Sequence, residues 1–157
     1  MTRRSRAREV ALQLLFQRDA NPTVPRPVIE RFARDRLGSP DAETFCLSLY
    51  DGVVRHLADI DPRITAASEN WKLHRMAASD RNVLRLGTYE IVFAQPPTPA
   101  PVALDEAIEL ARRYGTKDSP GFVNGVLDKV YHTHDEQQKQ APGLQAPVPN
   151  PQPAAAE

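Results

Sequence analysis

The stretch PVALDEAIELARRYGTKDSPGFVNGVLDKV, residues 101–130, contains two amphipathic helices and the break between them. In each half, apolar residues recur three or four positions apart, which is the spacing of one helical face. Gly115 is placed to end the first helix, and Asp118-Ser119-Pro120 supplies a capping side chain and a first-turn proline for the second. The two apolar faces comprise Leu104, Ala107, Ile108 and Ala111, and then Val123, Val126, Leu127 and Val130. The stretch therefore predicts two consecutive helices that pack by one face each.

The same spacing extends back to the N-terminus, and no convincing alternating run predicts a strand. Prolines and capping residues divide this part into five more helices, which we expect over residues 3–19, 27–36, 40–57, 62–71 and 80–94. Gly38 can end the second in a left-handed cap, and Ser39-Pro40-Asp41 starts the third. Asp61-Pro62 repeats that start signal, and Ser79 or Asp80 caps the fifth. The sequence therefore predicts an all-α, single-domain bundle of about seven helices.

Length and charge limit the classes of protein that this chain can be. Its 157 residues suffice for one domain, and 20 Lys+Arg balance 20 Asp+Glu, so the formal net charge is zero. Zero net charge argues against a protein that coats nucleic acid by bulk electrostatics. No apolar run reaches the roughly 18 residues of a membrane span, and no secretory signal precedes the first helix. We expect a cytoplasmic protein without a membrane partner.

Catalytic groups are sparse. The single Cys46 lies on a predicted buried face, and His56 falls on an apolar face, so both are interpreted as core or boundary residues. His132 and His134 form only a weak metal signal, and no glycine-rich phosphate loop occurs. We therefore predict a non-enzymatic protein with no cofactor and no metal.

The C-terminal part differs in composition. From about residue 134 the chain is rich in Ala, Gln and Pro and has little apolar surface to bury. We expect a helical domain over residues 1–133 and a disordered tail over residues 134–157.

The first helix carries more arginine than a bundle needs. Arg3, Arg4, Arg6 and Arg8 fall within six positions, and no acidic residue occurs before Glu9. Such a run is either a solvated helix end or an arm that binds phosphate.

Two helices carry apolar residues outside their main faces. Leu12 and Phe16 lie far from the main apolar face of the first helix, so either a neighbouring helix covers them or they form a partner-binding strip. The helix from Asp80 is apolar on two sides, which is typical of a central core helix. A patch near Asp80 and Leu84 could instead be exposed and dock another protein.

The start of the last helix combines Lys117, Asp118, Ser119 and Phe122. Free N–H groups and the helix dipole favour anions there, and an aromatic ring in the first turn could stack on an unpaired base. The alternative is a capping motif with a core phenylalanine. Gly125, in mid-helix, suggests close packing or close approach of a ligand.

Three blocks resemble the NusB family: RRSRAREVALQLLFQRD (residues 3–19), SDRNVLRLGTYEIVF (residues 79–93) and VALDEAIELARRYGTKDSPGFVNGVLDKV (residues 102–130). They occur in the family's order, and the similarity extends over about residues 3–131. The resemblance implies an all-helical antitermination factor built as two packed sub-bundles of three or four helices. It implies pairing with ribosomal protein NusE, binding of boxA RNA, and action with RNA polymerase on ribosomal RNA operons.

The resemblance also implies site residues. It makes Arg4, Arg6 and Arg8 an RNA-binding arm, and it places RNA contacts at Lys117, Asp118, Ser119 and Phe122. The partner-facing residues would be Phe16, Asp80 and Leu84, beside Leu12 of the same strip. Ser5 interrupts the arginine run, and Phe16 stands where the family often has tyrosine.

Two alternatives belong to other classes of protein. Helical domains of this kind are also fused to ribosomal RNA cytosine methyltransferases as guiding modules, and no nucleotide-binding domain follows residue 131 here. A protein-interaction adaptor, or a homodimer that covers the RNA surface, is the second.

Overall fold

The computed structural model describes residues 2–69 and 71–140, and all of its regular structure is helical. The elements are α1 (Arg3–Ala20), α2 (Arg26–Leu37), α3 (Pro40–Arg55), α4 (Leu57–Ala67), α5 (Ala78–Thr88), α6 (Ala100–Tyr114) and α7 (Ser119–Gln140), with a 3₁₀ turn, η1 (Leu73–Arg75), and a π-helical turn, η2 (Tyr89–Phe93). The predicted all-α class is confirmed. No helix in this described part is long and apolar enough to cross a membrane.

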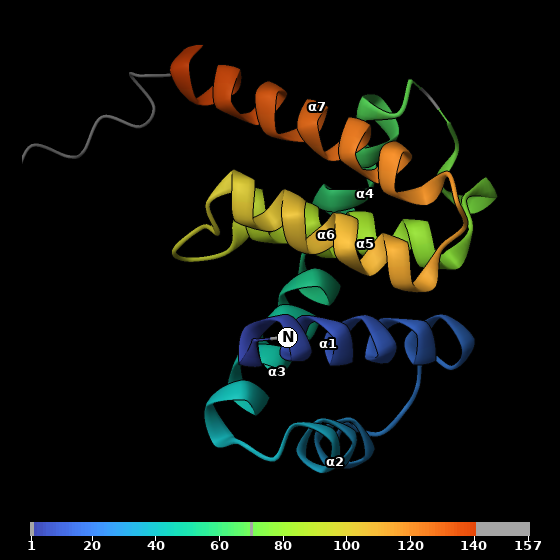
Figure 1. Ribbon diagram of the computed structural model, residues 1–157, viewed down its shortest axis with the longest axis vertical. Coiled ribbons are helices and arrows are strands. Elements are labelled where there is room, and N and C mark those ends of the chain that lie inside the picture. Colours follow the sequence, from blue (N-terminus) through green and yellow to red (C-terminus); the bar gives the residue numbers. More distant parts are fainter. Residues whose placement is uncertain (1, 70, 141–157) are drawn as a thin grey trace, which may run out of the picture.

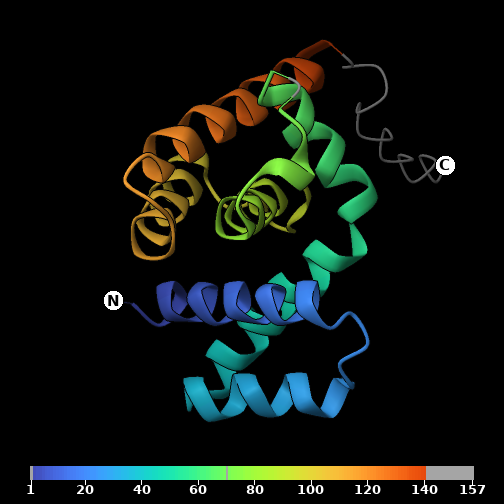
Figure 2. The same ribbon diagram turned by 90° about the vertical axis from the view of Figure 1, so that its right-hand side faces the viewer.

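The helices form two packed units, as Figures 1 and 2 show. The first contains α1, α2 and α3, and the second contains α4 to α7 with η1 and η2. The chain passes between them where α3 leads into α4, and α1 also packs directly against α5. The division into two sub-bundles is also confirmed, and one continuous apolar core joins them.

Several predicted helix ends are confirmed. Gly38 follows α2 with a φ of 64°, a left-handed conformation that glycine adopts without strain. Ser39 Oγ accepts a hydrogen bond from the Ala42 N–H at 3.5 Å at the start of α3, and Gly115 ends α6. These signals are local, which is why the sequence reveals them.

The fourth helix begins earlier than predicted. The third ends at Arg55, and α4 starts at Leu57, so Pro62 lies inside α4. Leu57, Ile60 and Ile64 have helical spacing, and both isoleucines are fully buried. Their burial outweighs the one hydrogen bond that proline cannot donate. The helix stops at Ala67, and the predicted end point, Trp71, lies in the next loop with 56% of its surface exposed.

Two further helix ends differ from the prediction. Ala77 stands at the cap position of α5, and neither Ser79 nor Asp80 caps it. Helix α7 continues past residue 134 to Gln140, so the predicted tail begins too early. Residues 141–157, the rest of that predicted disordered tail, lie outside the described residues.

Candidate nucleic-acid interface

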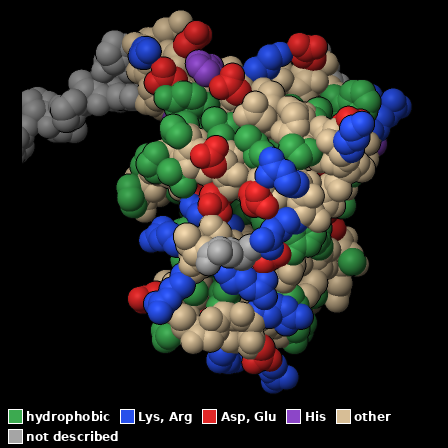
Figure 3. Space-filling view, in the orientation of Figure 1, with side chains coloured by type: hydrophobic (Ala, Val, Ile, Leu, Met, Phe, Trp, Pro, Cys, Tyr) green, Lys and Arg blue, Asp and Glu red, His purple; other side chains and the backbone are tan. Residues whose placement is uncertain are grey.

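The arginines at the start of α1 have different environments. Arg3 and Arg4 are exposed, and neither pairs with a carboxylate within residues 2–69 and 71–140. The guanidinium carbon of Arg4 lies 4.2 Å from the centroid of the Phe45 ring on α3. On the face shown in Figure 3, blue side chains gather around the start of α1, and red ones lie above them over α6. The first turn of α1 therefore offers cations to an anionic ligand.

Arg8 is part of the core and not of this exposed arm. It is only 4% exposed, and it donates two hydrogen bonds of 2.8 Å to Glu90, which is 2% exposed. Burial alone would lower the pKa of Arg8, but Glu90 and Glu106 outweigh burial and raise it. The prediction that Arg8 contacts RNA is thereby corrected. Its guanidinium Nε and Nη2 donate to Glu90, and its Nη1 lies 3.6 Å from the Glu106 carboxylate, so the group is engaged inside the protein.

Arg6 and Glu9 form an ion pair within α1, and Glu9 also contacts α6. Arg6 Nη1 lies 2.5 Å from Glu9 Oε1, and the Tyr114 hydroxyl donates to Glu9 Oε2 at 2.7 Å. Arg113 lies 3.4 Å from the same carboxylate. Burial alone would raise the pKa of Glu9, but these hydrogen bonds and charges lower it. Arg6 remains partly exposed, so it can still approach a phosphate beside its carboxylate.

The start of α7 is a tight turn with an exposed cation and an exposed carboxylate. Lys117 and Asp118 are exposed, whereas Ser119 is 2% exposed and its Oγ accepts from the Thr116 N–H at 2.9 Å. The predicted Ser119 contact is corrected: its hydroxyl closes the turn. Phe122 is half-buried and packs on the core by one side, so its predicted stacking on a base stays open.

Gly125 does not pack closely. A Cβ added there would meet no atom within 4 Å, so the close-packing interpretation is wrong, and ligand approach remains a prediction.

The interface has two parts, the arginines at the start of α1 and the turn at the start of α7. Helices α1 and α6, which run in parallel, connect them. Ser5 Oγ donates to Glu106 at 2.8 Å, in the middle of α6, and Gln13 donates to the Tyr114 hydroxyl at 2.9 Å at the end of α6. From Glu106 to Tyr114 the helix rises about 12 Å. The start of α7 therefore lies beyond the C-terminal end of α6, and the arginines lie beside its first half.

The predicted partner-binding strip is only partly exposed. Leu12 and Leu84 are both 0% exposed, so the interpretation of Leu12 as covered by a neighbouring helix is the correct one, and neither leucine offers a surface to a partner. Phe16 is half-buried, with its ring centroid 5.9 Å from that of Tyr114. Asp80 is partly exposed, although its Oδ1 is buried and finds no hydrogen-bond donor within the described residues. Phe16 and Asp80 remain available to a partner.

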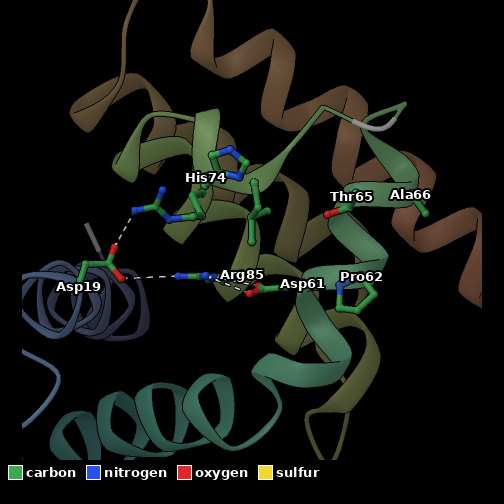
Figure 4. Close-up of a pocket in the computed structure, with 9 residues that line it drawn as sticks. Asp19, Asp61, Pro62, Thr65, Ala66, His74 and Arg85 are labelled. Atoms are coloured by element: carbon green, nitrogen blue, oxygen red, sulfur yellow. Dashed lines mark hydrogen bonds and ion pairs between the residues drawn. The ribbon is translucent and has the colours of Figure 1, made fainter.

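Close to Asp80, a pocket of about 760 Å³ opens between α1, α4, η1 and α5. In Figure 4, Arg85 lies between two carboxylates: it donates to Asp61 at 3.0 Å and pairs with Asp19 at 3.6 Å. Asp19 also accepts from Asn82 at 2.8 Å and from Arg81 at 3.1 Å. This network ties the end of α1 to α5 and gives the pocket a mixed charge.

Asp19 is expected to make stability depend on pH. Burial alone would raise its pKa, but the bonds from Asn82 and Arg81 and the charges of Arg81 and Arg85 lower it. Because the folded pKa lies below the unfolded one, the stabilisation is complete above the ordinary aspartate value and is lost as pH falls through the folded pKa. In urea unfolding, the difference between wild type and Asp19→Asn should be largest near neutral pH and shrink below about pH 4. A difference independent of pH would contradict this.

The remaining chemical groups have structural environments. Cys46 is buried, and burial raises the pKa of its thiol to about 12. The ring of His56 stacks on Phe93 at 4.6 Å between centroids, and its Nδ1 lies 2.9 Å from the Gly52 carbonyl oxygen. No group of three or more potential metal ligands occurs among the residues that the structure describes.

Fold and surface together define a class: a small all-α protein of two packed helical units that presents arginines and aromatic rings along one edge. Residues 5–132 match the sequence model of the NusB family. The transcription antitermination protein NusB of Sorangium cellulosum (strain So ce56) is 46% identical over 130 residues, covering 83% of this chain and 92% of that protein. The chain belongs to the NusB family.

Solved structures agree with this assignment. T. maritima NusB superposes with a TM-score of 0.74 at 36% identity, covering 89% of this chain and 97% of that one. A second similar chain comes from a crystal structure of antitermination factors NusB and NusE in complex with dsRNA. It has a TM-score of 0.75 and 27% identity, and covers 85% of this chain and 98% of that one.

Proposed function

We propose that this protein is a transcription antitermination factor that binds boxA RNA together with ribosomal protein NusE and promotes transcription of ribosomal RNA operons. The observation that carries the proposal is the similarity to NusB proteins over more than four fifths of the chain, one of them solved with NusE and RNA. Acting on nascent transcripts with RNA polymerase, it would work in the cytoplasm. The adaptor alternative without selective RNA binding is less favoured, because the matched relative is itself an antitermination protein of similar length.

The proposed mechanism is binding without catalysis. Arg3, Arg4 and Arg6 would neutralise phosphates at one end of α6. At the other end, Lys117 would bind phosphate, and the Asp118 carboxylate would accept a hydrogen bond from a base edge. Phe122 would stack on a base. Arg8 and Ser119 would hold these two ends in place from inside the protein.

The partner surface would lie at the C-terminal end of α1, beside α5. Phe16, Asp80 and the pocket beside Asp19 are its proposed elements. The exposed part of the Asp80 carboxylate would accept a hydrogen bond from NusE. Such an arrangement divides RNA affinity between two proteins, and this division accounts for a zero net charge on this one.

Fluorescence anisotropy with labelled boxA RNA and a scrambled control, with and without NusE, tests the function. Selective binding that tightens when NusE is added supports it. Equal affinity for both RNAs, unchanged by NusE, would refute it. Light scattering on the free protein tests the predicted homodimer separately.

Two sets of substitutions should separate phosphate binding from base recognition. Arg3→Ala/Arg4→Ala should weaken boxA and scrambled RNA alike and lower the salt slope by about 1.4, because each phosphate contact on a single strand contributes about 0.7. Phe122→Leu, which keeps an apolar contact with the core, should cost about tenfold in boxA affinity and less for the scrambled RNA. Anisotropy titrations at several salt concentrations measure both.

Phe32→Leu on α2 is the matched control for Phe122→Leu, because its half-buried ring packs against the core far from α6. If Phe122→Leu and Phe32→Leu bind boxA equally well, the stacking role of Phe122 is wrong. An unchanged salt slope in the arginine variant would exclude the arm from phosphate binding.

A further inference from the structure

A cavity of about 840 Å³ opens between the first turn of α1, α3 and the segment over residues 94–99. Its volume is within the range of small-ligand sites, about 300–1,000 Å³. It lies beside the first half of α6, where Pro99, Val102 and Glu106 line it, and the start of α7 follows the other end of that helix.

Phe45 lies at the centre of this region. A second hollow, of about 500 Å³, lies beside the first, and Arg3, Arg4, Phe45 and Ser48 line both. Both hollows therefore share the Phe45 ring and the Arg4 side chain that lies over it. Because Arg4 is exposed and has no carboxylate partner in the described ranges, it can leave the ring easily. The aromatic face and the space on both sides of Arg4 would then form one site.

The opposite side of the cavity is apolar and held firmly. Prolines 96, 97 and 99 line it together with Val102, which is 44% exposed. Thr98 fixes this segment: its N–H donates to the Glu90 carbonyl oxygen at 2.9 Å and its hydroxyl donates to the Glu90 carboxylate at 2.7 Å. Glu90 is in turn held by Arg8. The buried ion pair therefore shapes the cavity in advance of binding.

The charge of the cavity favours an anion with a flat apolar part. Arg3 and Arg4 line it without carboxylate partners among residues 2–69 and 71–140. Two carboxylates line the combined site: Asp41 lines the smaller hollow, and Glu106 in the larger one accepts a hydrogen bond from Ser5 and lies 3.6 Å from Arg8. An aromatic ring, nearby guanidinium groups and an apolar wall are the elements that bind an unpaired nucleotide.

We propose that Phe45 is a stacking platform for one unpaired RNA base, whose phosphate is bound by Arg4 and the next phosphate by Arg3. The base enters the cavity against the prolines, and Arg4 moves from the ring to the phosphate. This inference rests on the proposed RNA-binding function and adds a second base site to the one at Phe122. One strand occupies both sites by following α1 and α6.

The test uses Phe45→Leu, which keeps an apolar side chain and removes the aromatic face. Its matched control is Phe32→Leu, because the Arg36 guanidinium carbon lies 3.6 Å from the Phe32 ring centroid without such a cavity. We expect Phe45→Leu to weaken boxA RNA binding about tenfold, Phe45→Trp to keep it, and Phe32→Leu to leave it unchanged. Thermal unfolding of each variant shows whether the fold is intact.

A second readout reports stacking directly. 2-Aminopurine placed at successive positions of boxA RNA loses fluorescence where it stacks on an aromatic ring. One position should be quenched by wild type and by Phe122→Leu but bright with Phe45→Leu. If wild type binds boxA RNA while Phe45→Leu changes neither affinity nor any 2-aminopurine signal, the platform is refuted and the function stands. Loss of NusE binding with unchanged RNA affinity would refute it in favour of a protein site. Absence of RNA binding by wild type would overturn both.

Discussion

Arg8→Ala is expected to lower the free energy of unfolding by about 3–5 kcal/mol, because it leaves the Glu90 carboxylate buried without its cation. Both side chains are almost entirely buried, and the two hydrogen bonds between them join α1 to η2 across the two helical units. Thr98 also donates to Glu90, so the segment around Thr98 should become less firmly held when Arg8 is removed. Urea unfolding at neutral pH, followed by circular dichroism, measures the loss.

Arg26→Ala is the matched control. Arg26 makes an equally short two-bond pair with Asp51, at 2.6 and 2.9 Å, but its side chain is 44% exposed. Water screens such a pair, so its removal should cost at most about 1 kcal/mol. A second variant, Arg8→Met/Glu90→Leu, removes both charges and should recover much of the lost stability. If Arg8→Ala is as stable as Arg26→Ala, the buried pair is not an important contact between the units.

The contrast between Arg4 and Arg8 shows what the sequence can and cannot reveal. Both belong to one arginine run, so the sequence predicts one role for them. The structure separates them because the partner of Arg8 lies 82 positions away, on a turn that only tertiary packing brings near. Phe45 was missed for the same reason: its spacing on α3 indicates a core residue, and only the folded chain places Arg4 over its ring.

Helix caps and apolar periodicity are local, and they predicted the helices and most of their ends. Periodicity predicted less well which faces are covered. Helix α1 contacts α2, α3 and α5, so it is surrounded on several sides and buries Leu12 outside its main face. A single-helix pattern assumes one covered face and cannot anticipate this. The family resemblance identified partner-facing positions by alignment, but burial decides which side chains at those positions can make contact.

Leu84→Ala tests that distinction and should lower the free energy of unfolding by about 2–5 kcal/mol, the cost of a cavity at a fully buried leucine. In a chain of this size the melting temperature should fall by about 5–15 °C. Because Leu84 has no exposed surface, the folded variant should bind NusE nearly as tightly as wild type. Calorimetric titration well below the melting temperature measures that affinity.

Asp80→Ala, one helical turn earlier on α5, is the matched variant with the opposite expectation. Asp80 is partly exposed, so its loss should weaken NusE binding about tenfold. Stability should change little, because its buried Oδ1 has no donor in the described chain. Leu84→Ala should therefore lose stability but keep NusE affinity, and Asp80→Ala should keep stability but lose NusE affinity. Weakened NusE binding by a fully folded Leu84→Ala protein would contradict the assignment, because it would require α5 to expose that leucine when the partner binds.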